Sequence, residues 1–476
     1  MTRPRPAPGT LVDTQKESTM QRRTSSLLVA LALVGGCAAS SPRLDSYAPA
    51  HPGSTLAEAT VVDGEVASEP VPRAEAPASS PETSPDASAA KERAPRPSAG
   101  LLTAGSFRDL DEYARFVSLF ERGQAGAGEL FGLDERWGFH LRGRVPVLVD
   151  DDGAPVVDAR VRLYDKHERV VWEARTDNHG RAELFGALFR AAQGPYGVEV
   201  DSGGRVATKW GVDDASDAPV RLSLRGAKAP PAVLDLALLL DTTGSMGDEL
   251  SYLQAELQDV VARARREAMR RGAGQDLDVR LSLGFYRDHG DAYVVRDHPF
   301  THDVAEAARV LSSERADGGG DYPEALDEAL LTFAERRDWS QSARARLALV
   351  VLDAPPHDHP EVKARLEKAT RRFAEKGVRL VPVAASGVDR PTEGLLRLLQ
   401  VATGGSYVFL TNHSGVGGDH LEPVAGDYRV EPLNDLLVRL IAEAAREVPA
   451  VDEERPAVAH AVTDPRIHLS RRDALR

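Results

Sequence analysis

The chain has little cysteine, few aromatic residues and no long apolar run. Its 476 residues include one cysteine, Cys37, so no disulfide can form within the chain. No stretch of about 20 apolar residues is present, so an ordinary transmembrane helix is not expected. Aromatic residues make up only 5% of the chain, and acidic residues (73) outnumber lysine and arginine (59), for a formal net charge of -14. This balance argues against a general nucleic-acid binder, which needs a basic face.

The segment that ends at Cys37 has the pattern of an export signal. Met20 is closely followed by two arginines, the short apolar run 27–34 and two glycines. The last four residues, VGGC, resemble the lipobox of bacterial lipoproteins, in which the cysteine is acylated and begins the mature chain. The resemblance implies a signal region at 1–36 that starts at Met20, and a lipid anchor at Cys37 in the bacterial cell envelope. Since Ala38 rather than Asp follows, it further implies the outer membrane. A buried helix with a chance cysteine is the alternative.

Two further segments lack the composition of a folded domain. Residues 37–100 are rich in Ala, Pro, Ser and Glu and contain no Phe or Trp. Such a segment cannot bury enough apolar surface to fold, so we predict a disordered, semi-extended tether between the lipid and the folded parts. Residues 449–476 are polar and are predicted to form a loose tail.

Residues 101–226 are predicted to form a helix followed by a small all-β sandwich. Apolar residues first recur at helical spacing, with Ser106 as the candidate N-cap. The period then changes to two, and turn residues recur about every ten positions, which is typical of a sandwich of short strands. The stretches 153–161 (GAPVVDARV) and 176–182 (TDNHGRA) resemble the carboxypeptidase regulatory-like domain, a transthyretin-like sandwich.

Residues 230–448 alternate between apolar strands and amphipathic helices. The runs 236–240 and 347–352 contain no polar residue, which favours strands buried on both faces of a sheet. Between such strands lie helical patterns such as 250–264, with one apolar face. This order predicts a doubly wound, Rossmann-like α/β domain with a mostly parallel sheet and right-handed crossovers.

A cluster of oxygen-bearing residues follows the first of these strands. Asp241, Thr243 and Ser245 stand at alternate positions just after the strand ends. Open α/β sheets place their ligand sites at this edge. Three side-chain oxygens that can point to one place suit a hard cation such as Mg²⁺.

The stretch DTTGSM (241–246) resembles the D-x-[ST]-x-S metal motif of von Willebrand factor type A domains. Residues 318–325 (GGGDYPEA) and 349–357 (LVVLDAPPH) match the same family in the same order. The resemblance implies a metal-ion-dependent adhesion site that binds Mg²⁺, Mn²⁺ or Ca²⁺. An acidic side chain of a protein partner would then complete the coordination. The implied ligands are Asp241, Thr243, Ser245, Asp321 and Asp353.

Other interpretations of these residues remain open. Many family members have Thr where this chain has Asp321, and an extra carboxylate makes the metal less electrophilic. Asp321 could instead cap a helix that has Glu324 in its first turn. His357 and His359 could belong to a metal-dependent hydrolase, although no G-x-S-x-G, Walker or H-E-x-x-H motif is present. A purely structural metal in a scaffold is a third possibility. We expect a binding protein rather than an enzyme.

Overall fold

A computed structural model describes residues 102–122, 130–189, 194–214, 218–270, 276–320, 322–412, 420–424 and 428–450. The predicted signal region, tether and lipidation site Cys37 lie outside the described residues, and so does the C-terminal tail from residue 451 on. Asp321 also lies outside them. Among the residues that are described, no helix is both long and apolar enough to cross a membrane.

The largest element is a mixed eight-stranded sheet with the order β12-β11-β10-β13-β14-β15-β1-β16. The neighbouring strands from β11 to β15 in this order pair in parallel. The remaining pairs, β12 with β11, β1 with β15 and β16 with β1, are antiparallel. The bounds are β1 (Thr103–Phe107), β10 (Val233–Asp241), β11 (Asp278–Tyr286), β12 (Val295–Asp297), β13 (Ala345–Leu352), β14 (Val378–Ala384), β15 (Tyr407–Thr411) and β16 (Glu431–Pro432). The predicted α/β sheet is confirmed.

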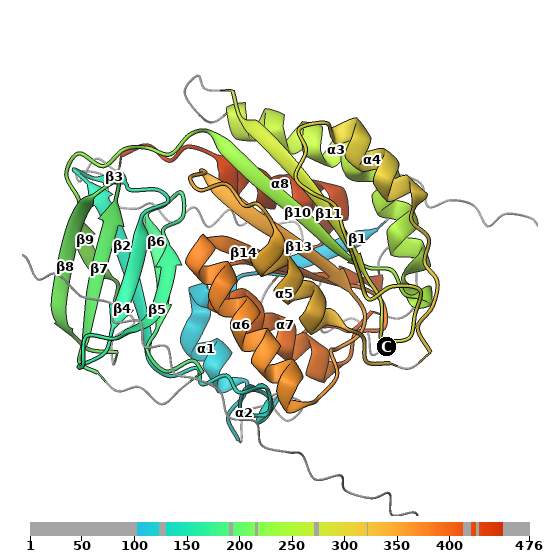
Figure 1. Cartoon of the computed structure of the whole chain (residues 1–476), viewed down its shortest axis with the longest axis horizontal. Helices are drawn as coiled ribbons and strands as arrows, with labels where there is room; N and C mark the ends of the chain where they lie inside the picture. The colour runs from blue at the N-terminus through green and yellow to red at the C-terminus, as the bar shows by residue number, and fades with distance from the viewer. Residues whose placement is uncertain are drawn as a thin grey trace, which may run out of the picture. The chain divides into compact units, whose positions relative to one another are not determined.

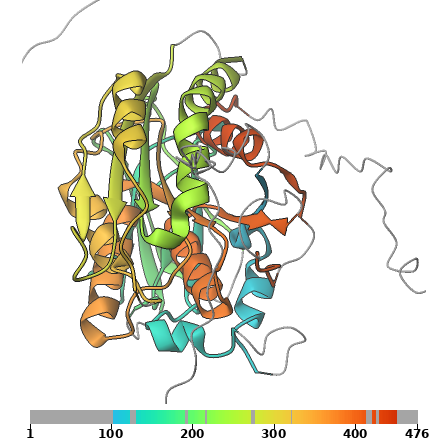
Figure 2. The ribbon, with the colours of Figure 1, turned by 90° about the vertical axis from the view of Figure 1, so that its right-hand side faces the viewer.

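Helices cover both faces of this sheet (Figures 1 and 2). Because side chains of a strand alternate between faces, β10 sends Leu236, Leu238 and Leu240 to one core and Ala237 and Leu239 to the other. The first core includes α3 (Gly247–Arg270), α4 (Val304–Ser313) and α8 (Leu433–Ala445). The second includes α5 (Leu326–Arg336), α6 (Pro360–Lys376) and α7 (Arg390–Thr403).

Two four-stranded, mainly antiparallel sheets form the predicted sandwich. One has the order β3-β2-β6, with β9 beside β2, and the other has the order β5-β4-β7-β8. Alternate residues of β2, among them Val145, Val147 and Val149, are buried between the sheets. The bounds are β2 (Arg144–Asp151), β3 (Ala154–Pro155), β4 (Arg160–Tyr164), β5 (Val170–Arg175), β6 (Arg181–Phe185), β7 (Tyr196–Ser202), β8 (Arg205–Val212) and β9 (Val220–Ser223).

The segment before the sandwich differs from the prediction. Ser106 is not a helix N-cap; it lies in β1, which pairs antiparallel with β15 in the large sheet. Helical structure begins only at η1 (Asp109–Glu112) and continues in α1 (Tyr113–Ser118) and α2 (Leu133–Trp137). The prediction failed because the pairing of β1 depends on a strand about 300 residues further along the chain, which no local pattern reveals.

Polar contacts join the sandwich to the α/β domain. The buried Arg346 of β13 donates a hydrogen bond to Asp158, with a distance of 2.8 Å from Nη1 to Oδ1. Asn178 donates to the carbonyls of Glu443 and Arg446 at the end of α8, at 2.8 and 3.1 Å. The two bonds from Asn178 satisfy carbonyls at the end of a helix, which have no partner within the helix itself.

Candidate functional site

The site is organised by Asp241, the last residue of β10. Its Oδ1 accepts hydrogen bonds from the backbone N–H of Thr243 at 2.9 Å and from the Thr243 hydroxyl at 2.6 Å. These bonds turn the chain out of the sheet and into the short helix η3 (Gly244–Met246), which leads directly into α3. Asp241 and Thr243 are each only 1% exposed. The loop that follows β10, residues 241–245, therefore holds its side-chain oxygens in a fixed turn.

A glycine-rich loop lies against this turn. The N–H of Gly244 donates to the carbonyl of Gly318 at 3.2 Å, and the N–H of Gly319 donates to Asp291 at 3.0 Å. Gly318 and Gly319 have φ of 79° and 70°, which an L-residue adopts only at a cost. A Cβ on Gly319 would stand 3.3 Å from both Glu324 and Thr243. The glycines are therefore required for the loop to approach the site closely.

Glu324 belongs to the site, which the sequence analysis did not predict. Its N–H donates to the carbonyl of Pro355 at 2.9 Å, and its side chain is 3% exposed. The helix α5 begins at Leu326 with Ala325 at its N-cap, so Glu324 is not in a first helical turn. The pairing with Pro355 places Glu324 beside the loop that follows β13. The sequence feature that could have indicated Glu324 as a site residue is its position as a second acidic residue, three positions after Asp321.

The other edge of the site comes from the loops after β13 and β14. Asp353 directly follows β13, and the nearby Ser245 hydroxyl opposes the rise of its pKa. Ser386 follows β14 and bonds through both its N–H and its hydroxyl to Glu249 in the first turn of α3. Ser245 itself is exposed, and Asp353 and Glu249 are buried. These residues meet at the C-terminal edge of the parallel strands, where open α/β sheets place their ligand sites.

Together these loops surround an open cleft of about 610 Å³. Asp241 does not line it but lies behind Thr243, to which it is bonded. The lining includes Thr243, Ser245, Gly318, Gly319, Gly320, Tyr322, Glu324, Asp353, Ser386 and Gly387.

The buried carboxyls have strongly perturbed titration. Burial raises the pKa of Asp241 to about 7; the hydrogen bonds from Thr243 oppose this effect, and the charge of Asp353 adds to it. Burial also raises the pKa of Glu324 to about 9, and the charges of neighbouring carboxylates, Asp241 first, contribute. Burial raises the pKa of Asp353 as well. These groups share one site and carry like charges, so they do not ionise together without a compensating positive charge.

Two carboxylate oxygens in the site have no hydrogen-bond partner among the described residues: Oδ2 of Asp241 and Oε2 of Glu324. The Tyr286 hydroxyl faces Asp241 and lowers the pKa of that carboxyl, but it is not at hydrogen-bonding geometry to Oδ2. Buried, unpartnered carboxylate oxygens are costly. Because hard cations take oxygen ligands, this donor set fits a divalent cation.

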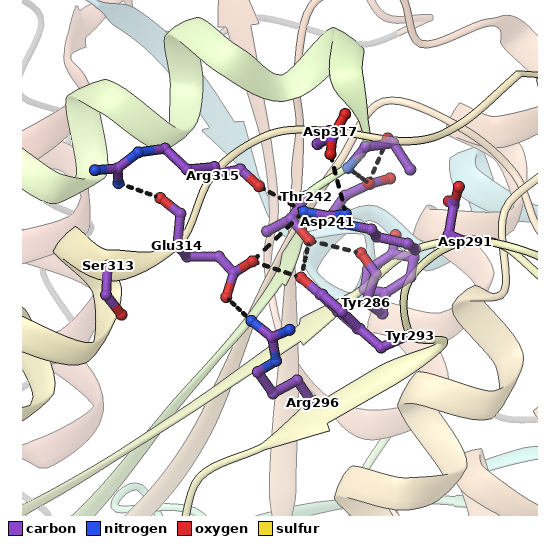
Figure 3. A network of polar contacts seen from close by, with 12 residues as sticks. Asp241, Thr242, Tyr286, Asp291, Tyr293, Arg296, Ser313, Glu314, Arg315 and Asp317 are labelled. Carbon is purple, nitrogen blue, oxygen red and sulfur yellow. Dashed lines mark hydrogen bonds and ion pairs between the residues drawn. The ribbon is translucent and has the colours of Figure 1, made fainter.

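Beside Asp241, a hydrogen-bonded network holds the end of β10 in place (Figure 3). The buried hydroxyl of Thr242 donates to the carbonyl of Tyr286 at 3.0 Å and lies 2.7 Å from the Tyr293 hydroxyl. Tyr293 in turn donates to Glu314 at 2.8 Å, and Arg296 pairs with the other oxygen of Glu314 at 2.7 Å. This network fixes the neighbour of Asp241 on the side away from the cleft.

The histidines of the hydrolase hypothesis are directed elsewhere. His357 Nε2 lies 2.8 Å from Oδ1 of the buried Asp288, and the rings of His289 and His359 lie 6.0 and 6.1 Å from the His357 ring. Neither His357 nor His359 lines the cleft. These histidines therefore form a cluster around Asp288, separate from the lining of the cleft.

Of the predicted ligands, the structure brings Thr243, Ser245 and Asp353 to one cleft, with Asp241 behind Thr243. Asp321 is outside the part of the chain that the structure describes. Within that part, no three or more His, Cys, Asp or Glu side chains form a group that could hold a metal ion. The predicted set relies on two hydroxyls, and among its described carboxyls Asp353 lines the cleft while Asp241 lies behind it.

Comparison with known proteins does not establish a family. No protein-family model matches the chain. Over 134 residues the chain is 30% identical to an ariadne-like RING finger protein of Acanthamoeba polyphaga mimivirus. That match covers 26% of this chain and only 11% of the viral protein. The solved structure of a conserved hypothetical protein, BatB from Bacteroides thetaiotaomicron, aligns with 44% of this chain and 86% of its own, at 16% identity and a TM-score of 0.24.

Proposed function

We propose that the cleft at the carboxyl edge of the large sheet is a divalent-cation site of the von Willebrand factor type A kind, used to bind a protein partner. The observation that carries the proposal is the pair of buried carboxylate oxygens without partners, on Asp241 and Glu324. The order of the three matching loops supports the same class of domain. The ligands would be Asp241, Thr243, Ser245, Asp353 and Asp321, with Glu324 beside them.

A bound cation would neutralise the buried carboxylates and offer a free coordination position to a carboxylate of the partner. The open cleft, with the exposed Ser245 at its surface, leaves room for such a ligand. An acylated Cys37 and the tether up to residue 100 would hold this domain at the bacterial outer membrane. Because several acyl chains hold a protein firmly where one does not, the anchor would be stable.

Metal binding is tested first, by isothermal titration of Mg²⁺, Mn²⁺ and Ca²⁺ into the full chain. We expect saturable binding in the parent and none in Asp241→Asn. The control variant Asp111→Asn makes the same chemical change at a side chain that is 66% exposed and remote from Asp241 in the sequence. This variant should bind the cations as the parent does. Equal binding by the parent and Asp241→Asn would refute the proposed ligand set.

Partner binding and anchoring need separate measurements. Envelope proteins retained by the immobilised parent in Mg²⁺, but not in EDTA and not by Asp241→Asn, would support adhesion. If Mg²⁺ raises the melting temperature while Asp241→Asn retains the same partners, the metal is structural instead. Radiolabelled palmitate should enter the parent and not Cys37→Ser; labelling of both would exclude Cys37 as the lipidated residue.

A further inference from the structure

A second cleft, of about 160 Å³, lies at the opposite edge of the large sheet from the candidate metal site. It is bounded by the beginnings of β13 and β14, by residues 404–406 before β15, by α8 and by the sandwich turn 177–179. A space of this volume holds several water molecules or a small ion. Its charged and titratable lining residues are Arg108, Asp177, His179, Arg379 and Glu443.

Arg379 occupies an unusual position in the sheet. It is the second residue of β14, so it shares a face with Val381 and Val383, which are buried against α8. Among the described residues, none forms a hydrogen bond or ion pair with its guanidinium, and burial lowers the pKa of that group. A guanidinium carries five N–H donors and stays charged. Arg379 is only partly buried, and it lines the cleft with donors that have no acceptor among the described side chains.

Arg108 enters the same cleft from the segment after β1. Its Nε is buried and has no partner within the described part of the chain, and its nearest carboxylate, on Asp111, is 4.0 Å away. The charge of Arg108 acts on both Arg379 and His179. Burial lowers the pKa of His179, so this side chain is a neutral imidazole that can still donate one hydrogen bond. Two cationic donors and one neutral donor therefore share the cleft.

The acidic residues nearby are engaged with other groups. Oδ1 of Asp177 accepts the backbone N–H groups of His179 and Arg181, at 2.8 and 2.9 Å. Glu443 pairs with Arg439 at 3.6 Å. Their charges reduce the positive potential of the cleft without filling the donor positions of its arginines. Among the described lining residues, no acceptor group faces the donors of both arginines at once.

We propose that this cleft binds a small tetrahedral oxyanion, of the phosphate or sulfate class, between Arg379 and Arg108. Charge-assisted hydrogen bonds from two guanidiniums approaching from different elements suit an anion that offers acceptors in several directions. Because the lining comes from the sandwich turn and from the α/β domain, the anion would also bridge these two parts. This site is independent of the metal-binding proposal, and neither depends on the other.

Titration of inorganic phosphate into the full chain, with chloride at equal ionic strength as the reference, tests the proposal. We expect saturable binding in the parent and a rise in its melting temperature with phosphate, because ligands of the native state stabilise it. Arg379→Gln should weaken binding by roughly tenfold or more, since it removes a charge-assisted contact. The matched control is Arg372→Gln, whose arginine is paired with Glu375 at 2.6 Å on the surface of α6.

Arg108→Gln provides a second variant should Arg379→Gln fail to fold, and it too should weaken phosphate binding. Sulfate should compete with phosphate, and acetate should compete poorly if the tetrahedral shape matters. The inference is overturned if the parent shows no binding at millimolar phosphate, or if folded Arg379→Gln or Arg108→Gln binds as the parent does. In that case the cleft holds water only.

Discussion

Replacing Asp241 by Asn should make the cation-free protein more stable at alkaline pH, although it removes a predicted ligand. Asn has the same shape as Asp, and its Oδ1 can accept the two hydrogen bonds that Thr243 donates. It carries no charge at any pH. The substitution therefore isolates the cost of ionising a carboxyl that is 1% exposed.

The size of the effect follows from the shift of the Asp241 pKa from 3.8 to about 7. Below pH 3.8 the carboxyl is protonated in both the folded and the unfolded chain. Above this pH the carboxyl ionises in the unfolded chain but stays protonated in the folded one, so the free energy of unfolding falls as the pH rises. The contribution of Asp241 to stability is fully lost above its folded pKa of about 7. A difference of about 3 in pKa corresponds to a free energy on the order of 4 kcal/mol. Glu324, whose pKa is raised to about 9, changes stability in the same direction.

Urea unfolding in EDTA, at pH values on either side of this window, measures the effect. The parent should lose stability on the order of a few kcal/mol between about pH 4 and pH 8, and Asp241→Asn should lose clearly less. Adding Mg²⁺ at the higher pH should restore the parent and leave the variant unchanged. If both proteins lose the same stability with pH, Asp241 is already ionised in the folded chain and the reasoning fails.

Three further substitutions test the framework around the site. Gly319→Ala, at φ 70°, should destabilise the protein by roughly 1–2 kcal/mol in urea and weaken the response to Mg²⁺, because its Cβ is forced toward Thr243; an unchanged unfolding midpoint would contradict this. Thr242→Val should cost about 1–2 kcal/mol by leaving polar partners unsatisfied, measured by the same method at fixed pH. Arg346→Met should cost about 1–3 kcal/mol, because Asp158 loses its buried partner and keeps only the contacts with Arg175 and the Ala343 N–H; a fully stable variant would show that the ion pair contributes nothing.

Periodicity predicted most of the α/β fold correctly. The strands after 236 and 347 were recognisable because both faces of a central parallel strand are buried, which leaves an unbroken apolar run. The edge strands β1, β12 and β16 were not predicted. They are short, partly exposed and defined by partners far along the chain, so the local sequence carries little signal for them.

The candidate site was predictable where it follows directly from a strand. Asp241 and Asp353 end or follow buried strands, and parallel strands bring their carboxyl ends to one edge. Glu324 was not predictable in this way. It reaches the cleft because its backbone pairs with Pro355, from a loop that only the folded sheet brings near. Its position after Tyr322 and Pro323 instead favoured the first turn of a helix, which was wrong.

The burial that makes these carboxyls costly is also what would give a cation its advantage. With no cation, Asp241 and Glu324 relieve the strain of like charges by taking up protons, as their raised pKa values indicate. A divalent cation would have to displace those protons, so protons and metal compete for the same oxygens. The competition weakens as the pH rises through the two pKa values. Burial of these carboxyls therefore lowers the stability of the cation-free protein and makes cation binding strongly dependent on pH. An exposed cluster of the same residues would show neither effect.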